Sequence, residues 1–403
     1  MNWDNLDDSR FKELGFKCGL EVHQQLDTAK KLFCRCPVGY VDGPPDGLIV
    51  RHMRPTLSEL GEYDGTALME FKTKKEVVYE LFRDNVCTYE MDDTPPFPIN
   101  QEALDIALQI SMLFNCHIVD ELHITRKQYL DGSIPTGFQR TAIVGVEGWI
   151  PYKDRKIRII QVALEEDACR EVHDIGHQIR FRTDRLSTPL VEIVTYPDMQ
   201  TPTEAMEVDE VIGRVLRSSG RVRRGIGVTR QDVNVSIDGG TRVELKGIDK
   251  TGYIKRLTEV EGLRQKSLLE IKSELRKRGI SPSTIHSEKK DLTEIFKKIA
   301  HPVISEVINN GGKVGGIMLE RFAGILNYKT QPNKTFADEI SGRIKVIACI
   351  DKYPNIIHSD DISCAELPDE ICDEIKKVFH MRHTDAIIIT WGLSLIHISE
   401  PTR

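Results

Sequence analysis

Residues 19–26 read GLEVHQQL, and apolar and polar side chains alternate over the first part of this stretch. Because successive side chains of a β-strand point to opposite faces, Leu20 and Val22 lie on one face, and Glu21 and His23 on the other. The stretch therefore predicts a strand with one apolar face and one face that carries a carboxylate and an imidazole.

The same alternation recurs in later stretches, which are separated by turn signals such as DGPP at residues 42–45 and DGG at residues 238–240. Their polar positions hold Gln161, Glu165, Asp167, Glu192, Asp232, Asn234, Ser236, Arg242, Glu244 and Lys246. Short alternating strands with a few helices between them predict an α+β fold over residues 17–250, with a mostly antiparallel sheet and flanking helices.

Helix signals mark the organisation of the chain. A capping box with a proline at residues 201–204 predicts a helix up to Gly220, and another is predicted from about residue 100 to 114. A charged amphipathic helix over residues 260–278 is followed by a polar linker that reaches Asp291. We therefore expect a boundary after residue 278 and a smaller α+β domain beyond it, with strands near residues 346–350 and 386–390.

The polar face of the sheet has two interpretations. A solvated outer face produces the same alternation. However, Glu, Asp and Asn are depleted in ordinary strands, and a lone charge such as Glu192 in an apolar strand is costly without a partner. Carboxylates suit Mg²⁺, which also binds nucleotide phosphates, so the pattern indicates phosphoryl transfer. The candidate cations for the phosphates are Arg126, Lys127, Arg185, Arg230 and Lys246.

Composition excludes several classes of protein. The 403 residues predict two or three domains, and no apolar run approaches the roughly 18 residues that span a bilayer, so no membrane partner is expected. Residues 1–17 carry charges throughout and lack the apolar centre of a signal peptide, which predicts a cytoplasmic protein. No P-loop pattern occurs, so a nucleotide site here must be of another kind.

Several stretches resemble, in order, the signature segments of one family of tRNA-dependent amidotransferase subunits, which has B-type and E-type members. They are GLEVHQQL (19–26), FCRC (33–36), RKQY (126–129), PTGFQ (135–139), LEEDA (164–168), PLVEIV (189–194) and RQDVNVS (230–236). The region from about residue 291 to 392 resembles an insert, similar to a domain of bacterial aspartyl-tRNA synthetases, that separates the E-type from the B-type. The chain is therefore identified as a member of this family, of the archaeal E-type that acts on Glu-tRNA(Gln).

The resemblance implies an ATP-dependent carbon–nitrogen ligase. ATP would phosphorylate the γ-carboxylate of glutamate on misacylated Glu-tRNA(Gln), and ammonia from an asparaginase-like partner subunit would displace the phosphate to give Gln-tRNA(Gln). The resemblance implies a hetero-oligomer that uses Mg²⁺. Carried onto this sequence, the catalytic and metal-binding set is Glu21, His23, Glu165 and Glu192, and the ATP-binding set is Lys127, Arg230, Asp232 and Lys246.

The resemblance also assigns the domains. Residues 1–278 would form the activating domain, called the cradle, and residues 279–392 an incomplete insert domain. The final stretch, LSLIHISEPTR at residues 393–403, resembles the translation of a sequencing adapter. We therefore expect the natural gene to continue beyond Gly392.

Two features leave alternatives open. B-type relatives hold zinc with a Cys-x-x-Cys and a Cys-x-Cys pair, whereas here Cys34 and Cys36 have only Cys87 and Cys116 as nearby helpers. The cysteines are thus either structural zinc ligands or buried or free thiols.

A cluster of arginines also has two interpretations. The side chains either bind tRNA phosphates or interact favourably with the negative C-terminal end of a helix dipole. The cluster consists of Arg214, Arg217, Arg221, Arg223 and Arg224.

Three functions are compatible with these patterns. The first is the activating part of the enzyme. The second is a tRNA-binding scaffold whose carboxylates are idle, and binding of Mg²⁺ and ATP to the polar face would distinguish the two. The third is an unrelated nucleotide-dependent ligase, which a strict requirement for charged tRNA would exclude.

Overall fold

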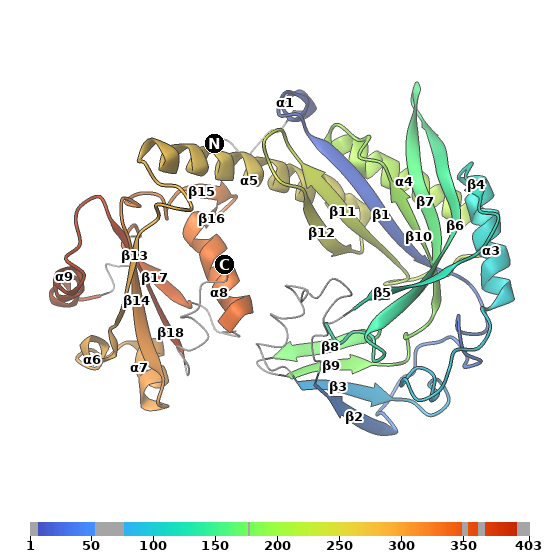
Figure 1. Ribbon diagram of the computed structural model, residues 1–403, viewed down its shortest axis with the longest axis horizontal. Coiled ribbons are helices and arrows are strands. Elements are labelled where there is room, and N and C mark those ends of the chain that lie inside the picture. The colour runs from blue at the N-terminus through green and yellow to red at the C-terminus, as the bar shows by residue number, and fades with distance from the viewer. Residues whose placement is uncertain are drawn as a thin grey trace. The chain divides into compact units, whose positions relative to one another are not determined.

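The stretch that opens the alternation lies in β1 (Lys17–Gln25), an inner strand of a large sheet. The computed structural model describes residues 7–52, 76–129, 131–175, 178–348, 354–361 and 367–392. The chain divides into two compact units, residues 1–262 and 263–403, whose elements are labelled in Figure 1. Each unit combines helices with mainly antiparallel strands, so the predicted α+β class with antiparallel sheets is confirmed.

The large sheet of the first unit has the strand order β12-β11-β1-β10-β7-β6-β4, and β5 also pairs with β6. The strands are β4 (His117–Ile118), β5 (Ile124–Gln128), β6 (Phe138–Tyr152), β7 (Arg155–Glu166), β10 (Pro189–Thr195), β11 (Thr229–Ser236) and β12 (Val243–Ile248). All of these pairs are antiparallel. β1 lies between β10 and β11, so polar residues from distant stretches become cross-strand neighbours.

Two predicted helices pack against this sheet. α4 (Pro202–Ser218) contacts β1, and α3 (Gln101–Leu113) contacts β6 and β7. The caps are those expected, since Thr201 Oγ1 accepts a hydrogen bond from the Glu204 amide at 3.1 Å and the Asn100 side chain caps α3. Both predictions are confirmed. The buried stripe of α4 covers the apolar face of the sheet and leaves the opposite face for polar groups.

A second sheet of the first unit has the order β2-β3-β9-β8. Its strands are β2 (Gly47–Arg51), β3 (Glu76–Leu81), β8 (Arg170–Ile175) and β9 (Gln178–Arg182). β3 and β9 run parallel, whereas the other pairs are antiparallel. Tyr79 and Phe181 stack with 6.2 Å between ring centroids in its core. Parallel pairing of segments so far apart in the chain leaves no local signal in the sequence.

α5 (Thr251–Lys277) is longer than the helix predicted from residue 260. Its first part belongs to the core of the first unit, where Gly262 packs against Phe11 of α1 (Asp8–Glu13). Its second part supplies Ile271 to a core cluster of the second unit. The two compact units therefore divide inside α5, N-terminal to the boundary expected after residue 278.

The second unit contains a sheet of order β13-β14-β18-β17. Its elements are β13 (Ser287–Asp291), α6 (Thr293–Phe296), α7 (Pro302–Asn309), β14 (Lys313–Leu319), β15 (Lys329–Gln331), β16 (Lys334–Thr335), α8 (Phe336–Ala348), β17 (Ile356–His358), α9 (Asp369–Val378) and β18 (Ala386–Gly392). Across the described parts of both units, no helix is long and apolar enough to cross a bilayer.

Two predictions for the second unit are wrong and one is confirmed. Residues 287–291, expected in a linker, form β13 because their backbone pairs with β14. Val346, expected in a strand, is an exposed residue of α8. The strand expected at residues 386–390 is β18, which is buried between two neighbouring strands. Residues 349–350 of the other expected strand, and the stretch 393–403, lie outside the described residues.

The buried Asp209 makes stability depend on pH. It lies on α4 and accepts hydrogen bonds from the side chains of Thr251 and Gln231. Burial is the main cause that raises the pKa of Asp209 from 3.8 to about 6. Because the folded protein then holds this proton more tightly than the unfolded chain, the free energy of unfolding falls as pH rises from 3.8 to about 6 and stays low above that range.

We expect Asp209→Asn to remove this dependence, because the amide does not ionise. The difference between the melting temperature of the variant and that of the wild type should therefore become more positive as pH rises from about 4 to about 7. Thermal denaturation followed by circular dichroism measures the difference, and Asp154→Asn, at an exposed position between β6 and β7, is the control. A difference that does not change with pH would contradict the assignment.

Candidate active site

His23, Glu165 and Glu192 form a close group on the polar face of the large sheet. The register of β1 and β10 sets His23 opposite Glu192, with His23 Nε2 3.3 Å from Glu192 Oε1. Glu165 lies two residues beyond Ala163, which is opposite Glu192, and so shares the face of Glu192. One ligand atom from each of the three residues lies within 4.8 Å of the others. These predicted metal ligands are close enough to share one ion.

Glu165 carries a buried oxygen atom without a partner. The residue is 1% exposed, and its Oε1 accepts a hydrogen bond from Thr141 Oγ1 at 2.9 Å. Its Oε2 makes no hydrogen bond within the described part of the chain. An unpaired buried carboxylate oxygen is costly, and a cation would satisfy it. The two carboxylates suit Mg²⁺, which prefers oxygen ligands, and the imidazole is a donor that divalent transition metals also accept.

The pKa values of the two carboxylates in this group are shifted in opposite directions. Burial raises the pKa of Glu165 to about 7, and the charge of Glu192 adds to the shift. Burial alone would lower the pKa of His23 and raise that of Glu192, but the hydrogen bond and attraction between them reverse both directions. The pKa shifts therefore favour the ionised form of Glu192 and the protonated form of His23, whereas burial drives Glu165 toward its protonated form. A bound divalent cation would favour the ionised form of both carboxylates and the neutral form of His23, because only a neutral imidazole can donate a lone pair to a metal.

Lys127 joins the group from β5. Its Nζ lies 3.7 Å from Glu192 Oε1, and half of its side chain is exposed. The ammonium is therefore accessible to an anion that approaches from solvent. The neighbouring Arg126, another candidate cation, has its guanidinium 5.2 Å from the centre of the Phe138 ring. Of these two cations, Lys127 is the one paired with the carboxylate group.

Glu21 lies in a second acidic group, with Asp232 and Glu244. The register of β1 and β11 sets Glu21 opposite Asp232, and the three carboxylates approach within 4.8 Å. Burial raises the pKa of Glu21, which accepts a hydrogen bond from Asn234 Nδ2 at 2.9 Å. Lys246 Nζ lies 3.3 Å from Asp232 Oδ2 and 3.0 Å from Glu244 Oε1. This group thus already contains a cation.

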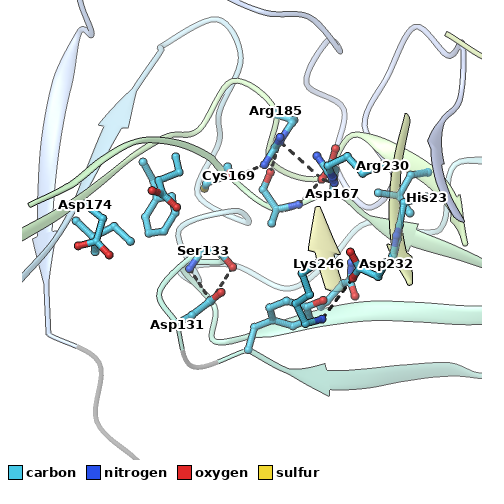
Figure 2. A pocket seen from close by; sticks show the side chains of 17 residues that line it. His23, Asp131, Ser133, Asp167, Cys169, Asp174, Arg185, Arg230, Asp232 and Lys246 are labelled. Carbon is cyan, nitrogen blue, oxygen red and sulfur yellow. Dashed lines mark hydrogen bonds and ion pairs between the residues drawn. The ribbon is translucent and has the colours of Figure 1, made fainter. Parts of the chain in front are cut away.

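A cavity of about 400 Å³ opens beside these groups (Figure 2). Its lining includes the predicted site residues His23, Arg230, Asp232 and Lys246. The volume lies within the roughly 300–1,000 Å³ of small-molecule sites. The structure therefore collects residues from β1, β11 and β12 around one space of suitable size.

Asp167 organises the cationic wall of this cavity, as Figure 2 shows. Its Oδ1 accepts a hydrogen bond from Arg230 Nη2 at 2.6 Å, and Arg185 Nε lies 3.7 Å from the same oxygen. Although burial alone would raise the pKa of Asp167, the two arginines hold it below its ordinary value. Two guanidinium groups are thereby fixed at the wall, where they can face an anion.

The sequence did not identify Asp167 as a site residue. The alternation places Asp167 on the polar face beside Glu165, directly after β7, but gives it no role in the catalytic, metal-binding or ATP-binding sets. The arginines that give Asp167 its role come from segments distant in the chain, so only folding reveals the arrangement.

Comparisons of the sequence with known proteins identify its family. The sequence pattern of the GatB/GatE catalytic domain matches residues 16–310, a range that contains all of the groups described above. The chain belongs to the GatB/GatE catalytic-domain family. The resemblance inferred from the signature segments is therefore confirmed.

Similar curated proteins are named as the E subunit of glutamyl-tRNA(Gln) amidotransferase. That of Methanocaldococcus jannaschii is 40% identical over 380 residues, and that of Saccharolobus islandicus is 42% identical over 385 residues. The matches cover 94% and 95% of this chain, but 59% and 60% of the relatives. The chain thus spans about 60% of the length of these relatives.

In this GatB/GatE family member, Cys34, Cys36 and Cys87 come together with Glu90. Their ligand atoms lie within 4.8 Å of one another. The prediction that Cys116 assists them is wrong, because Cys116 packs against glycines of β6. Three sulfur atoms and one carboxylate match in number and kind the four ligands that zinc accepts. The structural zinc site and the free thiols both stay predictions.

A buried ammonium lies at this thiol group. The side chains of Lys31 and Glu90 are both 0% exposed, with Nζ 2.6 Å from Oε1. Burial raises the pKa of Glu90 to about 7, although Lys31 opposes the shift. Hydrogen bonding with Cys34 is the main cause that lowers the pKa of Cys36 to about 6. Lys31 therefore compensates negative charge beside the group of three thiols and Glu90.

We expect Lys31→Met to lower the free energy of unfolding by about 3–5 kcal/mol, because the loss of one partner leaves a buried charge uncompensated. Urea denaturation should be followed above the Glu90 pKa of about 7. The double variant Lys31→Met with Glu90→Gln should recover part of the loss, since it removes the orphaned charge. Equal losses in the single and double variants would argue against the ion pair.

We expect Glu165→Gln to weaken Mn²⁺ binding by more than about tenfold, because it removes a charged ligand from the group with His23 and Glu192. Isothermal titration with Mn²⁺ measures the affinity. Glu244→Gln is the matched control, since it alters the second acidic group, where Lys246 already supplies a cation. The site would be misassigned if Glu244→Gln caused the loss and Glu165→Gln did not.

Proposed function

We propose that this chain is the activating part of a tRNA-dependent amidotransferase that converts Glu-tRNA(Gln) to Gln-tRNA(Gln) with ATP and ammonia. The observation that carries the proposal is the group of His23, Glu165 and Glu192, with an unpaired buried oxygen, beside a cavity with two fixed guanidinium groups. The name of the relatives supports the choice of tRNA substrate.

The reaction consists of two substitutions. A γ-carboxylate oxygen of the tRNA-linked glutamate attacks the γ-phosphorus of ATP, and ADP leaves with the electrons of the broken P–O bond. The nitrogen of ammonia then attacks the carbon of the acyl phosphate, which loses phosphate while the nitrogen loses a proton. Neither step needs a nucleophilic side chain, so catalysis rests on positioning and charge neutralisation.

The proposal gives each group of residues one task. His23, Glu165 and Glu192 would hold Mg²⁺, which polarises phosphoryl oxygens when bound. Lys127 would move from Glu192 to a phosphate oxygen, a shift that its half-exposed side chain permits. On the cavity wall, Arg230 would contact phosphate in an orientation that Asp167 fixes in advance.

Asp232 and Lys246 would complete the nucleotide site. Both line the cavity, and Lys246 Nζ lies 3.3 Å from Asp232 Oδ2. The exposed ammonium would bind phosphate, while Asp232 would limit where it can move. The second acidic group would thus orient a cation, with Glu21 beside it.

The remaining parts of the proposal concern partners. Ammonia would come from an asparaginase-like partner in a cytoplasmic hetero-oligomer, because the second substitution consumes ammonia, which hydrolysis of an amide supplies.

The second unit of the chain would correspond to the insert that is similar to a domain of bacterial aspartyl-tRNA synthetases. Its combination of a sheet and helices is compatible with that assignment.

We expect Glu192→Gln to lower ADP formation with Glu-tRNA(Gln) by at least about a hundredfold, because it removes the charge that pairs with His23 and Lys127. The assay uses the purified protein with its ammonia-supplying partner, and tRNA binding and circular dichroism are measured in parallel. Glu121→Gln, at an exposed position, is the control. Unchanged turnover with intact tRNA binding would support the scaffold function instead.

A further inference from the structure

The segment 211–230 is strongly basic in an acidic protein. It contains six arginines and no aspartate or glutamate, whereas the whole chain has a formal net charge of -7. Its arginines are Arg214 and Arg217 on α4, Arg221, Arg223 and Arg224 in the following loop, and Arg230 on β11. Such a local concentration of one charge favours an anionic partner.

The structure separates these arginines into paired and unpaired groups. Arg214 lies 3.9 Å from Glu210, Arg221 lies 3.3 Å from Glu102, and Arg230 pairs with Asp167. Within the described residues, no ion pair involves the other three, which are Arg217, Arg223 and Arg224. These three guanidinium groups therefore form no close ion pair within the described residues, although the charge of Arg217 helps to lower the pKa of the buried Asp209.

The helix dipole explains only one of the unpaired arginines. α4 ends at Ser218, so Arg217 lies in its last turn. Arg223 and Arg224 come after the helix, and the dipole acts only within the last turn. The alternative that these arginines serve the helix therefore fails for the loop.

The loop is fixed beside the candidate active site. The Arg223 amide donates to the Gln25 carbonyl at 3.0 Å, and Gln24 Nε2 donates to the Arg223 carbonyl at 3.1 Å. Gln24 directly follows His23 on β1. Gly225 and Gly227 have positive φ angles of 131° and 78°, and between them Ile226 is 95% exposed. Arg223 and Arg224 thus stand on an anchored, protruding loop at the end of the strand that carries His23, whereas Arg217 lies in the last turn of the helix that precedes this loop.

We propose that Arg217, Arg223 and Arg224 form a contact surface for the phosphate backbone of tRNA, which guides the charged end of the substrate to the cavity. The inference rests on the proposed function. Arginine forks fit phosphate oxygens bidentately. RNA is favoured over an acidic protein partner because the buried centre of a protein interface is enriched in apolar and aromatic residues, whereas Ile226 is the only exposed large apolar residue in this fully described loop.

The triple variant Arg217→Gln, Arg223→Gln and Arg224→Gln tests the surface. Fluorescence anisotropy should show at least about tenfold weaker binding of a tRNA(Gln) transcript, and a slope of log affinity against log salt that is smaller by about two to three. A non-cognate tRNA should lose affinity equally, because phosphate contacts carry no sequence information. Arg83→Gln, at an exposed position after β3, is the matched control and should bind as the wild type does.

Kinetics separate this inference from the proposed function. In the amidotransferase assay the triple variant should raise the KM for Glu-tRNA(Gln) and leave kcat unchanged at saturating tRNA. Unchanged tRNA affinity and salt slope would overturn the surface, and weakened binding of the ammonia-supplying partner with unchanged tRNA affinity would reassign it to a protein interface. If the wild type bound tRNA through these arginines but formed no ADP, the proposed function would fail while the surface stood.

Discussion

The candidate site depends on the register of β1 between β10 and β11. Leu20 and Val22 are buried in the core, so His23 must point to the opposite face, where it meets Glu192. A slip by one residue would turn His23 into the core and expose the apolar residues. The burial that stabilises the sheet therefore also aligns the imidazole with its carboxylate.

Buried carboxylates are the main cost of this arrangement, and the surrounding groups offset it unequally. Asp167 is matched by two arginines, and Glu192 by His23 and Lys127. Glu165 accepts a hydrogen bond from Thr141, and the charges of His23 and Lys127 offset its burial only in part, since its pKa stays raised. The uncompensated charge is thus concentrated at one oxygen atom, which is where an added cation would stabilise the protein most. An uncompensated buried charge of this kind lowers the stability of the free protein and raises its affinity for a cation.

Much of the first unit could be predicted from local pattern. The alternation around Glu21 and the cap at Thr201 depend on neighbours in sequence, and both were interpreted correctly. In the second unit, the short apolar run around Val346 predicts a strand, because such a run has no period that distinguishes a strand from a helix. The exposed position of Val346 on α8 is set by packing, which the sequence does not display.

The sequence by itself determined the family, the antiparallel sheet and the residue types of the site, because signature segments and period-two alternation are local properties. Only the tertiary structure decided how those residues group. Glu21 joins Asp232 rather than Glu165, Glu90 replaces Cys116 beside the thiols, and Asp167 binds two arginines. The physical reason is that strand pairing brings together side chains whose separation along the chain carries no information about their distance in space.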